Sequence, residues 1–192
     1  MDGNQVLKVA GGLLALLMIV PLVVSAVRQN GAGQSFAMWA LWAVLDTTVT
    51  VSLIAQEGNL WLSAGYAAGS VTLAGVLLVK GRCTWGRMES LIAVLVVACL
   101  VTWKLGGPRV ATVSATVAIV IAGVPGMLEL WRSPQRSQAM VWAGFTLANL
   151  LSLAGGAGWS IEERLAPAMF AGQTLVLTLI GLRPVPKPSG VT

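Results

Sequence analysis

The sequence predicts an all-α integral membrane protein with seven transmembrane helices, arranged as two parallel three-helix repeats joined by a linker helix. Of its 192 residues, 56% are hydrophobic and only 10% are charged, whereas a soluble domain has about 25% charged residues. The charges are bunched, and most apolar runs between them approach the length of about 20 residues that a helix needs to cross a bilayer. The beginning and the end of the chain also resemble each other, which indicates an internal repeat.

The expected helices follow from the runs between charged residues. At a rise of about 1.5 Å per residue, most of these runs cover the hydrocarbon thickness of about 30 Å. The fourth run is the shortest, because Glu89 and Lys104 flank it, so Lys104 must extend its charged end to the interface. We expect seven helices at 9–27, 36–55, 60–79, 90–103, 110–128, 138–155 and 165–182.

These helices are expected to form a single membrane domain over residues 1–183. Repeat one covers 9–79, the linker helix 88–104 and repeat two 110–182, and a proline-rich cytoplasmic tail follows at 184–192. Because the linker crosses the membrane once between two sets of three helices, both repeats run in the same direction. They would then be related by an axis along the membrane normal.

The basic residues orient the chain. With the N-terminus outside, eight of the 12 lysines and arginines fall on the cytoplasmic side and four on the outer side. Cytoplasmic loops of membrane proteins are enriched in these residues. We therefore expect a bacterial-type inner membrane protein with the N-terminus outside and the C-terminus in the cytoplasm. The eight cytoplasmic residues are Arg28, Lys80, Arg82, Arg87, Arg132, Arg136, Arg183 and Lys187.

The composition also narrows the chemistry. The net charge of +5 is spread between spans and not gathered on one water-facing surface, so we expect no nucleic-acid partner. The chain has no histidine, which removes the commonest metal ligand and general base. We expect no enzyme activity, no catalytic residues, no cofactor and no metal site. Cys83 and Cys99 are expected to be free thiols, because a disulfide between them would have to cross half the bilayer.

The internal repeat pairs residues of the first three helices with residues of the last three. Pro21 and Pro125 interrupt their helices at matching depths, and each stands seven residues before an arginine. Because proline kinks a helix, the two prolines either act as a matched pair of hinges or only shape the helix bundle. The paired positions are Pro21 and Pro125, Arg28 and Arg132, Gln34 and Gln138, Trp39 and Trp142, Trp42 and Phe145, Asp46 and Asn149, Gly58 and Gly156, and Trp61 and Trp159.

The second helix of each repeat carries an aromatic and polar stripe. The spacing i, i+3, i+7 puts each set on one face of its helix, namely Trp39, Trp42 and Asp46 in one repeat and Trp142, Phe145 and Asn149 in the other. Asp46 falls near the bilayer centre, where a carboxylate costs about 2.5–3.5 kcal/mol. Two interpretations stay open: the polar pair forms the floor of a binding cavity, or it provides hydrogen bonds between helices.

The stripes resemble a known family of transporters. The pattern WxxWxxxD in one repeat and WxxFxxxN in the other looks most like the WxxWxxxN motif of the PnuC vitamin-precursor transporters, within the SWEET, PQ-loop and PnuC group of seven-helix transporters. The stretch 123–132 looks like a PQ-loop helix, although Gly126 follows Pro125 where that family has glutamine. The resemblance implies that all six stripe residues line a central cavity and bind solute.

Two functions follow as hypotheses. The first is a carrier for a small polar or aromatic-bearing solute, with alternating access that is passive or, through Asp46, proton-linked. The second is a non-transporting membrane scaffold or assembly factor that kept the fold. A carrier needs a polar cavity, so a direct bond between Asp46 and Asn149 across a packed core would count against transport. The lipid bilayer is an expected partner, and the sequence leaves open whether the chain forms a homo-oligomer.

Overall fold

The computed structural model is built of α-helices and describes residues 2–28, 36–81 and 85–184. Within these residues there are six helices and no strand, so the all-helical prediction is confirmed. Gln34, Arg82, Cys83 and most of the expected tail fall outside the described residues. The helices are α1 Gly3–Arg28, α2 Phe36–Ile54, α3 Trp61–Val79, α4 Arg87–Arg132, α5 Arg136–Ala154 and α6 Ile161–Gly181.

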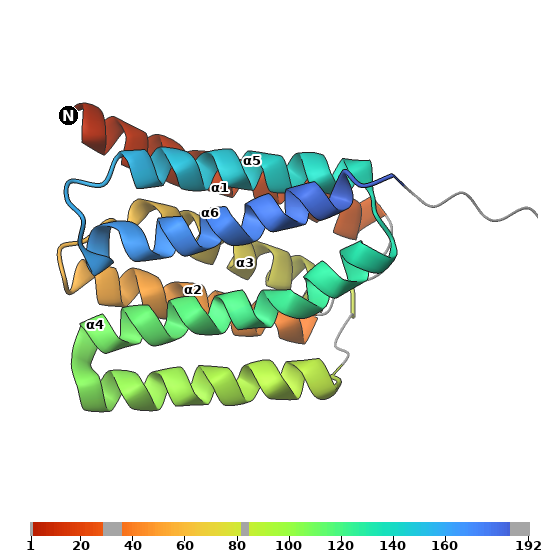
Figure 1. Ribbon diagram of the computed structural model, residues 1–192. Helices are drawn as coiled ribbons and strands as arrows, with labels where there is room; N and C mark the ends of the chain where they lie inside the picture. Colours follow the sequence, from red (N-terminus) through yellow and green to blue (C-terminus); the bar gives the residue numbers. More distant parts are fainter. Residues whose placement is uncertain (1, 29–35, 82–84, 185–192) are drawn as a thin grey trace, which may run out of the picture.

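The helix α4 corrects the expectation of seven separate helices. The runs 90–103 and 110–128 belong to one element of 46 residues, and the linker helix predicted at 88–104 is its first arm. Inside α4, Gly107 has φ 77° and ψ −173°, a conformation that residues with a Cβ rarely adopt. Pro108 follows it and starts the second arm, where its missing N–H is tolerated. The chain folds back at this point, so the two arms lie antiparallel (Figure 1).

The helices have the length and composition of an integral membrane protein. Five of the six described helices are long and apolar enough to cross a membrane, and α5 is the exception. Its 19 residues match the length of α2 and α3, but Arg136, Ser137 and Gln138 at its start make α5 less apolar. On the other helices, large apolar side chains such as Leu13 and Val94 are exposed. These apolar helices are compatible with contact to a lipid bilayer.

The helices pack in two sets that follow the same order. In the set α1–α3, which we call the first group, α3 lies between α1 and α2. In the set formed by the second arm of α4, α5 and α6, which we call the second group, α6 lies between α5 and α4 (Figure 1). The groups meet where α1 packs on α5 and α2 packs on α4. The interior of the molecule is the space between these two groups.

The chain runs between two ends of the bundle. One end, which we call the Lys8 end, holds the start of α1, the connection between α2 and α3, the turn at Gly107 and the connection between α5 and α6 (Figure 1). The opposite end, which we call the Arg28 end, holds the last residues of α1 and the starts of α2 and α5. The start of α1 and the last residues of α6 therefore lie at opposite ends.

Candidate functional site

The stripe on α2 is buried, and its two indole N–H groups have no partner. Trp39 is 7% exposed and Asp46 5% exposed, and Trp42 is half-buried. The rings of Trp39 and Trp42 meet edge to face with centroids 5.2 Å apart. Their Nε1 atoms are buried and bond to no group among the described residues. Asp46 differs, because its Oδ2 accepts a hydrogen bond from the hydroxyl of Ser70 at 2.8 Å.

The stripe on α5 is also buried, and its polar residue is fully engaged. Phe145 is 2% exposed and Asn149 is 0% exposed, while Trp142 is half-buried. The ring of Trp142 tilts against that of Phe145 at a centroid distance of 5.6 Å. Asn149 Nδ2 donates to the hydroxyl of Thr174 on α6 at 3.2 Å. The amide is therefore held between helices by polar contacts, as the hydrogen-bonding interpretation of the stripes expects.

Both groups hold their polar stripe residue in the same way. In each group, a hydroxyl on the helix that lies between the other two contacts the polar residue of the stripe: Ser70 contacts Asp46, and Thr174 contacts Asn149. The two polar residues are 103 positions apart in the sequence and their hydroxyl partners 104 apart, which matches the separation of the paired residues in the first two helices of each repeat. The equivalent contacts therefore link equivalent positions of the two groups.

Tyr66 joins the two stripes and was missed by the sequence analysis. It lies on α3, one helical turn before Ser70, so one face of α3 reaches both Asp46 and Asn149. The Tyr66 hydroxyl is 3.2 Å from Asn149 Oδ1 and 3.0 Å from Nδ2. No direct bond between Asp46 and Asn149 is found in the described structure. A signal was available in the sequence, because Tyr66 is the one tyrosine of the chain and falls within an expected span, where a phenolic hydroxyl needs a polar partner.

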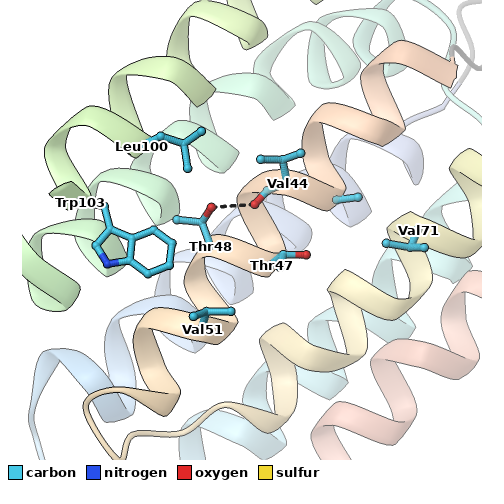
Figure 2. Close-up of a pocket in the computed structure, with 8 residues that line it drawn as sticks. Val44, Thr47, Thr48, Val51, Val71, Leu100 and Trp103 are labelled. Carbon is cyan, nitrogen blue, oxygen red and sulfur yellow. Dashed lines mark hydrogen bonds between the residues drawn. The ribbon is translucent and has the colours of Figure 1, made fainter.

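The two hollows that the structure describes lie away from the stripes. The larger of the two described, about 380 Å³ in volume, is apolar and lies between α2, α3 and the first arm of α4. Figure 2 shows Leu100 and Trp103 projecting from α4 towards Thr48 on α2. The second, of about 330 Å³, includes Arg109 and Ile161 in its lining. None of the six stripe residues lines either hollow, and the Tyr66 ring packs on Phe145 and Phe170 beside the α5 stripe.

Polar contacts close the Lys8 end of the interface between the groups. Lys8 on α1 and Glu163 on α6 form an ion pair with Nζ and Oε2 2.7 Å apart. Three further side chains bridge the groups at this end: Asn59 donates to Ser152, Gln56 donates to Thr112, and Ser52 contacts Thr112, at distances of 2.8–3.0 Å. The stripes, in contrast, extend from mid-depth towards the Arg28 end, because Trp39 and Trp142 lie near the starts of α2 and α5.

The two expected hinge prolines lie inside helices. Pro21 is exposed within α1 and Pro125 is half-buried within the second arm of α4. Both helices continue past the proline and end at the paired arginines Arg28 and Arg132. The matching positions are thus seen in the structure, and their role as hinges stays a prediction.

No group of three or more His, Cys, Asp or Glu side chains that could hold a metal ion is found among the described residues. Cys99 is buried and free in the described structure.

Comparisons with family models, with curated proteins and with solved structures found no match to this chain. The resemblance to the SWEET, PQ-loop and PnuC group thus rests on the stripe motifs and on the stretch around Pro125.

Proposed function

We propose that this protein is a membrane carrier of SWEET- and PnuC-like fold for a small polar or ring-bearing solute. In this proposal the two arms of α4 are separate spans, so the chain crosses the membrane seven times and forms two parallel three-helix repeats. The shared packing order of the two groups and their equivalent polar contacts support a repeat. The basic residues support an N-terminus outside and a cytoplasmic Arg28 end, in a bacterial inner membrane.

The unpartnered indole groups of Trp39 and Trp42 are the observation that supports a binding role most directly. Leaving a buried donor without an acceptor costs about 1–3 kcal/mol, and the interior of a membrane protein offers no bulk water to compensate. Both Nε1 atoms belong to the stripe that ends at Asp46. A solute with acceptor atoms would satisfy these donors, while Asp46 would bind a hydroxyl or amine of the same solute.

The closed Lys8 end and the position of the stripes support access from the Arg28 end. A solute entering from the Arg28 end would pass Trp39 and Trp42 before it reaches Asp46. Release on the other side would require the contacts around Lys8 and Glu163 to separate, so the two groups would rock against each other with Pro21 and Pro125 as hinges. If Asp46 also exchanges a proton with each side, transport is proton-linked.

The packed interior favours a second candidate, the non-transporting scaffold. Tyr66 fills the space between Phe145 and Phe170, and neither described hollow reaches the stripes. A scaffold would keep this packing at all times. The two candidates therefore differ in whether any solute enters between the groups.

A thermal-shift screen of the purified protein against sugars, nucleosides and vitamins tests the carrier. We expect one of these solute classes to raise the melting temperature of the wild type. Asp46→Ala should weaken the binding of that solute by about 10- to 100-fold, because it removes a hydrogen bond to a charged group. Trp42→Phe keeps a ring and removes the donor, so we expect a loss of about fivefold. Trp103→Phe, outside the stripes, is the control and should bind like the wild type.

Uptake of the selected solute into reconstituted vesicles separates the two candidates. A carrier accumulates or equilibrates the solute, and a proton-linked carrier does so faster with a pH gradient in the wild type but not in Asp46→Asn. Absence of both a shift and uptake for all three classes would favour the scaffold. A shift that Asp46→Ala leaves unchanged would remove Asp46 from the site.

A further inference from the structure

Tyr66 occupies the centre of the interface between the groups. Its ring stacks on Phe145 with centroids 5.5 Å apart and planes 26° apart, and it meets Phe170 edge-on at 5.6 Å. Tyr66 and Phe170 each lie four residues before the hydroxyl that contacts the polar stripe residue, Ser70 and Thr174, so they occupy equivalent places in the two groups. Two equivalent positions that touch each other lie beside the axis that relates the groups. The Tyr66 side chain is therefore central, although α3 itself packs mainly on α1 and α2.

Two residues of the α5 stripe contact the Tyr66 side chain. Phe145 supplies a flat face to the ring, and Asn149 supplies both a donor and an acceptor to the hydroxyl. One phenolic oxygen thus contacts both ends of a carboxamide. A planar ring that carries a separate donor and acceptor side by side would satisfy Asn149 more completely than Tyr66 does.

We propose that Tyr66 is a built-in occupant of a ring-binding position and that a solute must displace its side chain to bind. The solute class is a flat heteroaromatic ring with an adjacent donor and acceptor. This inference rests on the proposed carrier function and adds a residue that sets its specificity. Displacement is feasible because α3 and α5 touch only narrowly, so the side chain can leave Phe145 and Asn149 without separating helices that pack extensively.

The single tyrosine allows displacement to be observed in the unmodified sequence. Fluorotyrosine incorporation should give one fluorine NMR resonance, from Tyr66, shifted by the two rings that contact it. The probe is 2-pyridone, a planar ring whose N–H and carbonyl are adjacent, and toluene is the matched ring without polar atoms. We expect 2-pyridone to move the resonance to the position of a solvent-exposed tyrosine in a saturable manner, and toluene to leave it unchanged.

Variants separate displacement from a merely structural role. Tyr66→Ala should bind 2-pyridone about tenfold more tightly than the wild type, because no stacking contact or hydrogen bond has to be given up first. Tyr66→Phe, which keeps the ring and removes the hydroxyl, should fall between the two. Adding Asn149→Leu to Tyr66→Ala should reduce the affinity for 2-pyridone to that for toluene.

Three outcomes would overturn the inference: a resonance that stays in place at saturating 2-pyridone, equal affinities of the wild type and Tyr66→Ala, or no binding to either protein. Failure of the carrier proposal looks different. In that case 2-pyridone displaces Tyr66 but vesicles take up no solute of this class. Conversely, uptake of a solute with an unmoved Tyr66 resonance would support the carrier and reject Tyr66 as the occupant.

Discussion

Replacing Lys8 by methionine is expected to destabilise the protein by about 3–5 kcal/mol, the cost of breaking a buried ion pair by removing one partner. The side chains of Lys8 and Glu163 are only 11% and 12% exposed, and Nζ lies 2.7 Å from Oε2 and 3.0 Å from Oε1. Glu163 Oε2 also accepts the backbone N–H of Ala157 at 3.0 Å. Without Lys8, the Glu163 carboxylate would stay largely buried with this one donor among the contacts described for it.

Reversible unfolding in mixed detergent micelles measures this loss as a free energy of unfolding. Glu163→Gln should destabilise the protein by a comparable amount. The double variant Lys8→Met with Glu163→Met should recover most of the loss, because it removes both charges and leaves neither unpaired. Lys104→Met, at an exposed position, is the control and should change the stability by less than about 0.5 kcal/mol. A double variant as unstable as the single variants would contradict this account.

The second large effect is expected at the crossing of α1 and α3. A Cβ at Gly65 would meet the backbone carbonyl oxygen of Gly12, and a Cβ at Gly12 would meet that of Trp61. Neither contact can relax by a side-chain rotation, so the two helices must move apart. We expect Gly65→Ala to lower the stability by about 1–3 kcal/mol, the usual range for overpacking, and Gly12→Val to lower it further.

Gly75 provides a matched control on the same helix. A Cβ at Gly75 would have no neighbour within 4 Å, so Gly75→Ala should be neutral or should stabilise α3 by up to about 1 kcal/mol through its higher helix propensity. The same unfolding measurement applies to both variants. If Gly65→Ala and Gly75→Ala had equal effects, the close approach of α1 and α3 would not limit stability.

Local patterns in the sequence predicted the helices well, because hydropathy and charge act residue by residue. All expected helix runs fall largely on helical segments of the structure, and the stripe spacing correctly brought Trp39 and Asp46 to a buried face. The break that the pattern placed between 103 and 110 falls at Gly107, where the backbone is non-helical and the chain reverses between the two arms of α4.

The partners of polar side chains were less predictable from the sequence than the helices. The spacing of Ser160 and Glu163 predicts a capping box at the start of the last helix, yet Ser160 makes no side-chain capping bond and Glu163 pairs with Lys8. This pair joins residues 155 positions apart. A local motif and a distant partner compete for the same carboxylate, and only the fold, which brings Lys8 near the start of α1 to Glu163 near the start of α6, decides between them.

The sequence by itself determined the all-helical class, the apolar helices typical of a membrane protein and which residues form the two stripes, because the hydrophobic effect and helix periodicity act over a few turns. The tertiary structure decided which groups those stripes meet. Tyr66 reaches Asn149 across 83 positions, because the rotation of α3 turns one face towards both stripes. Such a contact depends on how whole helices cross and rotate, which the spacing of residues along one helix does not encode.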